Sequence, residues 1–279
     1  MSPNPMRVGR AKRSLGQNFL VDPNLQRKIV AELEAGPDHA VLEIGPGHGE
    51  LTTHLAGRVR RLVLVEKDRD LVAGLRERWP AEVSTPTAGA GVTVIEADAL
   101  DIDLSSLAAD ESDLLVLSNV PYNVTSPLLF AFLGMNPRPR RVVVTIQREV
   151  AERIVARPGG KSYGALSVGV QSVATAELRF GVARTAFRPV PDVDSATVRL
   201  DPYRPGPGHE ELGQLRDLTR ILFSRRRKQL QKTLRTAPEL GFTRDPVAFL
   251  RGLGIDPAAR PETLSPAELM IVARALASG

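Results

Sequence analysis

The stretch Ala40-Val41-Leu42-Glu43-Ile44-Gly45-Pro46-Gly47-His48-Gly49 joins a short apolar run to a glycine-rich turn. The apolar run, residues 40–44, predicts a buried strand, and a helical pattern begins behind the turn at residues 50–57. Glycines in such a turn let the backbone approach a ligand closely at the carboxyl end of the strand. This order of strand, glycine-rich turn and helix is typical of the first unit of a Rossmann-like α/β domain.

Strands and helices continue to alternate along the chain. Further strands are expected at 61–65, 92–95, 114–117, 141–146 and 193–200. Helices are expected at 68–79, 125–133 and 149–156, after a first helix that starts at Pro23, and an amphipathic or buried segment covers 165–174. Alternation of this kind predicts parallel strands joined by crossover helices. The fold class is therefore α/β, with a mainly parallel sheet.

A Pro- and Gly-rich segment, 203–208, divides the chain and is interpreted as a linker. Residues 1–202 are assigned to the α/β domain. Helical patterns at 212–234, 246–253 and 266–277 predict a small all-helical domain over 209–279. A chain of 279 residues fits one larger and one smaller domain. The stretch 80–91 is longer and more irregular than a minimal connection, and its sequence indicates no function.

Composition agrees with a soluble globular protein, and a cytoplasmic location is expected. Hydrophobic residues make up 42% and charged residues 25%, and no segment has the run of about eighteen apolar residues expected of a membrane span. Cysteine is absent, which excludes disulfides and thiolate metal ligands and fits a reducing compartment. The histidines are dispersed, so no metal site is expected. They are His39, His48, His54 and His209.

The charge balance favours an anionic partner. The formal net charge is +5 and the pI is about 9.9. Seven basic residues and no acidic one lie between Arg220 and Arg235, and residues 1–13 form a basic arm that we expect to be flexible. A solvated helix face or a disordered tail would show the same charge run. The unbalanced run favours nucleic-acid contact instead. The residues proposed for it are Arg225, Arg226, Arg227 and Lys228.

Polar residues follow successive predicted strands. Glu66 lies 21 residues beyond Gly45, where it can hold two ribose hydroxyls. Pro46 removes an N–H group that a pyrophosphate would need, so a nucleoside without phosphate, S-adenosylmethionine, fits better. Asp98 is placed to accept from an adenine amino group, and Asn119 lies toward the methionine end. Each residue alone could equally be a helix cap or a loop residue, but together at one sheet edge they indicate a cofactor site.

The turn Asn119-Val120-Pro121-Tyr122 suits chemistry on the amino group of a flat base. The lone pair of an exocyclic adenine amine is delocalised into the ring, so the amine must be held and its hydrogens accepted. The Asn119 side-chain oxygen and the Pro121 carbonyl could accept them, and Tyr122 could stack on the base. A Pro-fixed loop after a strand would give the turn alone a purely structural explanation.

Together these motifs resemble those of the ribosomal RNA adenine N6-dimethyltransferases of the KsgA type. The resemblance starts near residue 10 and extends past the α/β domain. One departure is Val120, where the family usually has Leu or Ile. The matching segments are Ser14–Asp22, Glu43–Gly49, Glu66, Asp98, Asn119–Tyr122, Phe187–Ala196, Phe223–Lys228 as a basic helix, Leu253–Pro257 and Arg260–Glu262.

The resemblance implies a class I methyltransferase domain that uses S-adenosylmethionine. Tyr122 and Phe187 would sandwich the target base, and Asn119 with Pro121 would hold its amine. The implied activity is dimethylation of two adjacent adenosines in a 3′-terminal hairpin of 16S rRNA, by a monomer acting late in assembly of the small ribosomal subunit. The implied cofactor-binding residues are Gln17, Asn18, Leu20, Gly45, Gly47, Glu66, Lys67, Asp98, Ala99 and Asn119.

Three other functions share parts of this pattern. A DNA adenine methyltransferase usually needs a sizeable target-recognition region, and only residues 209–279 follow the linker. Macrolide-resistance methyltransferases of the large subunit share the catalytic motifs, but segments 187–196 and 253–262 look more like the KsgA type. A mainly non-catalytic assembly factor is the third alternative, and the presence of Asn119, Tyr122 and Glu66 argues for activity.

Overall fold

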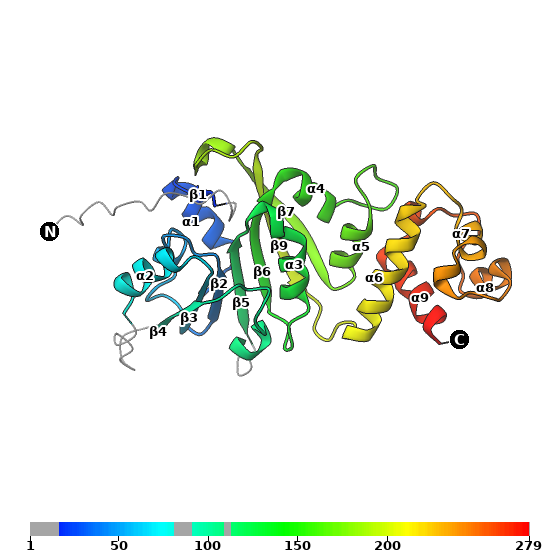
Figure 1. Ribbon diagram of the computed structural model, residues 1–279, viewed down its shortest axis with the longest axis horizontal. Coiled ribbons are helices and arrows are strands. Elements are labelled where there is room, and N and C mark those ends of the chain that lie inside the picture. Colours follow the sequence, from blue (N-terminus) through cyan, green and yellow to red (C-terminus); the bar gives the residue numbers. More distant parts are fainter. Residues whose placement is uncertain (1–16, 81–90, 109–112, 279) are drawn as a thin grey trace. The chain divides into compact units, whose positions relative to one another are not determined.

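The computed structural model describes residues 17–80, 91–108 and 113–278 (Figure 1). The expectations for the basic arm 1–13, for Ser14 to Gly16 and for nearly all of the irregular stretch 80–91 lie outside these residues. The chain forms two compact units. The sheet unit comprises Met1–Arg148 and Leu178–Leu200, and the helical unit comprises Glu149–Glu177 and Asp201–Gly279.

A seven-stranded sheet organises the sheet unit, with strand order β4-β3-β2-β5-β6-β9-β7. The pairs β2·β3, β3·β4, β2·β5 and β5·β6 are parallel, and β9 runs antiparallel to β6. The order reverses beside β2, which has β3 on one side and β5 on the other, so the carboxyl ends there form a switch point where α/β proteins bind ligands. The strands are β2 Ala40–Ile44, β3 Arg61–Glu66, β4 Gly91–Glu96, β5 Leu114–Asn119, β6 Arg141–Gln147, β7 Ala174–Val182 and β9 Ser195–Pro202.

Helices and short elements surround this sheet. Helix α1 begins where the sequence predicts, because Asp22 accepts from the N–H groups of Asn24 and Leu25 and Pro23 takes the first helical position. Two residue pairs, Phe19–Leu20 (β1) and Phe187–Arg188 (β8), form a separate antiparallel ladder. The helices are α1 Pro23–Ala31, α2 Arg69–Arg78 and α3 Thr125–Leu133, and the 3-10 turns are η2 Thr52–His54, η4 Leu104–Ala108, η5 Tyr122–Val124 and η6 Arg184–Ala186.

For this unit one sequence expectation was wrong and one strand was missed. The helix expected at 50–57 is only the 3-10 turn η2, because Thr52 donates its hydroxyl to the buried Glu43 carboxyl at 2.7 Å and Thr53 donates to the Gly49 carbonyl. Strand β7 was not predicted. Most of its side chains are exposed or half-buried at the edge of the sheet, so it lacks the apolar alternation that marks a strand.

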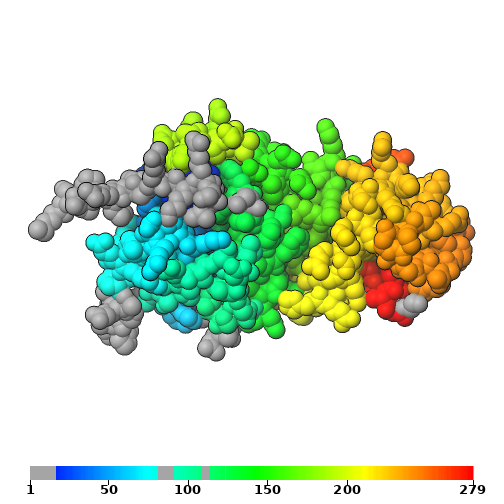
Figure 2. All heavy atoms as spheres, in the orientation of Figure 1, coloured from blue at the N-terminus to red at the C-terminus, as the bar shows by residue number. Residues whose placement is uncertain are grey.

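The helical unit includes a segment that the sequence placed with the α/β domain. The expected boundary was 203–208, but Tyr163 and Val168 pack in one hydrophobic cluster with Leu215 and other leucines of the C-terminal helices. The Tyr163 hydroxyl also donates to the Leu264 carbonyl at 2.8 Å. The remaining elements are α4 Arg148–Ile154, α5 Ala165–Gln171, α6 His209–Ser224, α7 Leu230–Thr236, η7 Pro238–Leu240, α8 Pro246–Gly252, η8 Pro261–Thr263 and α9 Pro266–Ala277. Atoms after residue 209 run from yellow to red in Figure 2.

The single helix expected at 212–234 was also wrong. It breaks at residues 225–229 into α6 and α7, so the basic run lies in a turn and not on a helix. Arg225 donates to the Thr236 carbonyl at 3.0 Å, and the Leu230 N–H bonds the Ala259 carbonyl at 2.8 Å. The break therefore follows from contacts with distant segments, without a glycine or proline at the site.

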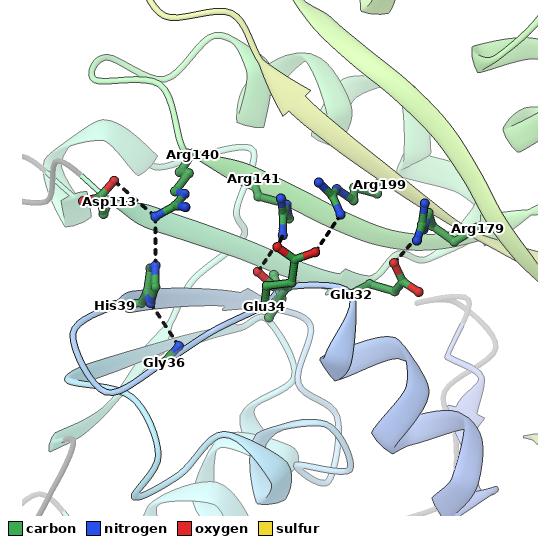
Figure 3. A network of polar contacts seen from close by, with 10 residues as sticks. Glu32, Glu34, Gly36, His39, Asp113, Arg140, Arg141, Arg179 and Arg199 are labelled. Carbon is green, nitrogen blue, oxygen red and sulfur yellow. Dashed lines mark hydrogen bonds and ion pairs between the residues drawn. The ribbon is translucent and has the colours of Figure 1, made fainter.

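A polar network joins the end of α1 to the amino-terminal side of the sheet (Figure 3). Glu34 has a φ of +52°, and its carboxylate pairs with Arg141 at 2.7 Å and Arg199 at 2.9 Å. The hydrogen bond from Arg141 lowers the pKa of Glu34. Arg141 starts β6 and also donates to the Leu33 carbonyl, so the network orients α1 at the edge opposite the switch point.

Candidate functional site

A cavity of about 190 Å³ lies at the carboxyl ends of β2, β3 and β5, inside the sheet unit. Its lining includes every residue that the sequence analysis assigned to cofactor or base, though their roles stay predictions. These residues are Gln17, Asn18, Leu20, Gly45, Gly47, Glu66, Lys67, Asp98, Ala99, Asn119, Pro121, Tyr122 and Phe187. The parallel register brings them together, since strands that run the same way end at one edge.

The glycine-rich turn requires glycine at two cavity positions. Gly45 has a φ of +68° and Gly47 a φ of +63°, a conformation that side chains disfavour. A Cβ on Gly47 would lie 3.0 Å from the Phe19 ring and 3.1 Å from the Glu50 carboxylate. The backbone here is therefore packed closely on both sides.

Glu66 ends β3 and fastens this turn to α2. One carboxylate oxygen accepts from the Gly47 N–H at 3.2 Å and the other from the Asp68 N–H at 2.9 Å. Burial raises the pKa of Glu66, because it disfavours the charged form. Since each carboxylate oxygen has two lone pairs, Glu66 keeps acceptor capacity for a ligand hydroxyl.

Asp98 and Lys67 form an ion pair at the cavity rim, with Nζ to Oδ2 at 2.6 Å. The Asp98 Oδ1 accepts from the Leu100 N–H at 3.0 Å. The hydrogen bond from Lys67 is the main cause of the lowered pKa of Asp98, so this carboxylate is charged at neutral pH. Lys67 thus holds Asp98 in position.

The segment 17–20 covers the cavity through the β1·β8 ladder, in which Leu20 lies opposite Phe187. The Phe19 ring lies 4.4 Å from the His48 ring, centroid to centroid. Gln17 donates to the Asp68 carboxylate at 2.8 Å, which ties the segment to the start of α2. The residues predicted to cover a cofactor are thus joined to the residue predicted to stack on the base.

Asn119 is oriented by the same segment. Its Nδ2 donates to the Asn18 carbonyl at 3.0 Å, which leaves Oδ1 as the acceptor of that side chain. The carbonyl of Pro121 accepts from the Val124 N–H at 3.2 Å and shares the Thr125 hydroxyl, at 3.4 Å, with the Tyr122 carbonyl at 3.3 Å. The Val120 carbonyl accepts no hydrogen bond from the described residues. Val120 therefore offers a freer acceptor than Pro121.

The two aromatic side chains differ in burial. Tyr122 is half-buried in the lining, and its hydroxyl lies 2.7 Å from the Ser195 Oγ. Phe187 is 1% exposed and packs in the main hydrophobic cluster of the sheet unit. Tyr122 therefore offers the more accessible ring face.

Sequence reasoning did not assign Glu43 and Glu50, which also line the cavity. Burial raises the pKa of Glu43 to about 8 and that of Glu50 to about 7. Glu50 accepts from the His48 N–H at 3.1 Å. An acidic residue inside a buried strand, as at Glu43, was a signal in the sequence, whereas Glu50 resembled an ordinary surface residue at a helix start.

A family model for ribosomal RNA adenine dimethylases matches residues 8–276. The chain belongs to the ribosomal RNA adenine dimethylase family. The family predicted from the sequence is thereby confirmed, as is the assignment to methyltransferases. Curated relatives of this dimethylase named ribosomal RNA small subunit methyltransferase A include one from Nitratidesulfovibrio vulgaris, 44% identical over 96% of this chain and 97% of the relative. Another, from Acidithiobacillus ferrooxidans, is 41% identical over 95% of this chain and 94% of the relative.

Solved structures confirm the predicted fold of this family member. A dimethyladenosine transferase from Plasmodium falciparum superposes with a TM-score of 0.79 at 24% identity, over 91% of this chain and 95% of that one. The 23S rRNA methyltransferase ErmE gives a TM-score of 0.67 at 27% identity, over 93% and 99%. Among the described residues, no helix is long and apolar enough to cross a membrane, and no cluster of three or more His, Asp or Glu could hold a metal ion.

Proposed function

We propose that this dimethylase transfers methyl groups from S-adenosylmethionine to N6 of two adjacent adenosines in a 3′-terminal hairpin of 16S rRNA. The proposal assigns the reaction to the cytoplasm, late in assembly of the small subunit, and to a single copy of the chain. The main support for this proposal is that the glycine-rich turn, Glu66 and the Asn119–Tyr122 turn line one cavity. Cofactor site and base site are thus adjacent.

The residues of the cavity fit S-adenosylmethionine. Glu66 would hold the ribose, Asp98 the adenine, and Asn18, Leu20 and Gly45 would enclose the rest. Burial disfavours the charges of Glu43 and Glu50, and a cationic ligand would favour them. When bound, this cofactor supplies a methyl group on a sulfonium, which an amine can displace.

The chain's own contribution to the reaction is orientation. We assign the Asn119 Oδ1 and the Val120 carbonyl as acceptors of the two N6 hydrogens, because the Pro121 carbonyl already accepts from the Val124 N–H and shares the Thr125 hydroxyl with the Tyr122 carbonyl. The two acceptors aim the lone pair and stabilise the positive charge that grows on N6. Tyr122 and Phe187 would hold the ring by stacking on its two faces. The N6 proton can then leave to water, so no side chain has to act as a base.

Sequence similarity favours the small ribosomal subunit as the substrate over the alternatives. The relatives named for the small subunit are 44% and 41% identical, whereas the 23S rRNA methyltransferase ErmE is 27% identical. A purely non-catalytic role is disfavoured because Asn119, Tyr122 and Glu66 all line the cavity.

The test is transfer of radiolabelled methyl from S-adenosylmethionine to small subunits that lack the modification. Large subunits, naked rRNA and duplex DNA are the parallel substrates. We expect dimethyladenosine in the small-subunit RNA. Label confined to large subunits or DNA would overturn the substrate, and absence of label from every substrate would overturn the catalytic role.

For RNA contact we propose a basic cluster in the helical unit. The hydrogen bonds from the N–H groups of Leu230 and Gln231 to the 257–259 loop bring Arg260 beside the turn at 227–229. Arg225 and Arg226 of the predicted run pair with Glu239 and Glu262 and hold the turn. The basic cluster, whose exposed side chains make no ion pair with described residues, is Arg227, Lys228, Lys232, Arg235 and Arg260.

Removal of two cluster charges, Lys232→Ala with Arg235→Ala, should weaken binding to small subunits in a salt-dependent way. Each lost phosphate contact lowers the slope of log K against log salt by about one, so a slope change of about two is expected. The matched control is Arg220→Ala with Arg251→Ala, two exposed arginines of the same unit outside the cluster. Filter binding across a salt series measures the slope of log K against log salt for each double variant. Equal slopes for the two would contradict the assignment of RNA contact to the basic cluster.

A further inference from the structure

Ser195 makes a contact that the reaction described above does not use. Its Oγ lies 2.7 Å from the Tyr122 hydroxyl, and its side chain is fully buried. Ser195 is the first residue of β9, whereas Tyr122 begins η5, which follows β5. The hydrogen bond therefore links the start of β9 to the segment after β5. A buried hydroxyl requires a hydrogen-bond partner, and this one is the tip of a cavity side chain.

The backbone around Ser195 is held firmly. Ser195 lies opposite Gln147 in the β6·β9 ladder. The preceding residue, Asp194, accepts from the Arg148 N–H through its carbonyl at 3.0 Å and from the Arg184 N–H through its carboxylate at 2.9 Å. The serine hydroxyl is therefore a fixed point of the scaffold.

Tyr122 lies on a different kind of element. A 3-10 turn of three residues gives the ring little support, and the side chain is only half-buried. A hydrogen bond at the tip of the ring restricts rotation about both side-chain torsions, which lowers the entropy lost when a base stacks on it. Burial raises the pKa of Tyr122, so its hydroxyl stays protonated at neutral pH.

We propose that Ser195 is a positioning residue for the target base: its hydrogen bond holds the Tyr122 ring in the orientation that stacks on adenine. The inference rests on the proposed function, because it needs a base at Tyr122. It assigns Ser195 to the base site and not to the cofactor site. It also gives a role to the serine of the Phe187–Ala196 segment.

A double-mutant cycle tests this role. Ser195→Ala and Tyr122→Phe each remove one hydroxyl of the pair, and each should lower kcat/KM for small subunits by about three- to tenfold, the worth of one hydrogen bond. The double variant should be no worse than Tyr122→Phe alone, because Ser195 acts through that hydroxyl. Affinity for S-adenosylmethionine, measured by calorimetry, should not change in any of the three.

Thr197→Val is the matched control. Thr197 is a fully buried residue of the same strand, and its hydroxyl lies 3.4 Å from that of Thr145, away from Tyr122. The variant measures the general cost of losing a buried hydroxyl in β9 and should keep normal kcat/KM. Ser195→Thr, which retains the hydroxyl, should recover most of the activity.

The outcomes separate the two proposals. If the wild-type protein methylates no substrate, the proposed function fails first. If the wild type is active and the Ser195→Ala and Tyr122→Phe effects multiply in the double variant, the positioning role is overturned. Wild-type kinetics in Tyr122→Phe would overturn it as well, and that test holds even if Ser195→Ala does not fold.

Discussion

Replacement of Asn119 by alanine is expected to lower kcat by about two to three orders of magnitude, the effect of removing one preorganised group that stabilises transition-state charge. The Asn119 Nδ2 donates to the Asn18 carbonyl, which leaves Oδ1 as the atom proposed to accept from the target amine. Without it, one amine hydrogen has no acceptor and the lone pair is not aimed. Single-turnover methylation of small subunits measures the loss.

The control for Asn119→Ala is Asn119→Asp. The aspartate keeps an acceptor oxygen but loses the donor to the Asn18 carbonyl, so we expect a rate between those of the wild type and the alanine variant. Thermal unfolding and cofactor affinity should show that the fold of both variants persists. Turnover of Asn119→Ala within about threefold of the wild type would refute the role in amine orientation, because that loss is far below the expected electrostatic effect.

The sequence predicted which residues line the cavity because they follow strand ends. Glu66 and Asn119 are 53 positions apart, yet the parallel register of β3, β2 and β5 places both at one edge. An apolar run followed by a polar residue is visible without a structure. Strand ends were predicted less accurately than strand positions: β5 extends through Asn119 itself, two residues beyond the predicted end.

Contacts between distant segments were the part that the sequence did not predict. The turn at 225–229 that separates α6 from α7 contains no glycine or proline. The contacts of Arg225, Arg226 and Leu230 with remote residues explain it. The same is true of Ser195, whose partner Tyr122 is 73 positions away. The local pattern of apolar and polar residues predicts burial and secondary structure, but it does not predict which side chain a buried hydroxyl contacts.

The motif alone did not decide which backbone carbonyl accepts from the target amine. The Asn119–Tyr122 turn predicts that a carbonyl next to the proline accepts from the target amine. The hydrogen bonds of the turn distinguish the two candidates. The Pro121 carbonyl accepts from the Val124 N–H and shares the Thr125 hydroxyl with the Tyr122 carbonyl, whereas the Val120 carbonyl accepts from none of the residues that the structure describes. The motif therefore predicts a carbonyl acceptor next to the proline, and the hydrogen bonds around η5 and α3 favour the Val120 carbonyl for that role.

Glu66→Ala should weaken binding of S-adenosylmethionine by about 10- to 100-fold, because hydrogen bonds to a charged group contribute about 1.5–3 kcal/mol. The carboxylate has two tasks: it would hold the ribose, and it accepts from the N–H groups of Gly47 and Asp68. Alanine removes both, whereas Glu66→Gln keeps one acceptor oxygen and should lose less. Isothermal titration calorimetry with the cofactor measures each variant.

Glu96→Ala is the matched control for this prediction. Glu96 lies directly opposite Glu66 in the β3·β4 ladder, but it is exposed and outside the cavity lining. It therefore reports the cost of losing a carboxylate at this sheet edge without loss of a ligand contact, and its cofactor affinity should equal that of the wild type. Equal affinities for Glu66→Ala and Glu96→Ala would move the ribose contact to another residue. A loss confined to Glu66 would tie cofactor binding to the same carboxylate that holds the glycine turn.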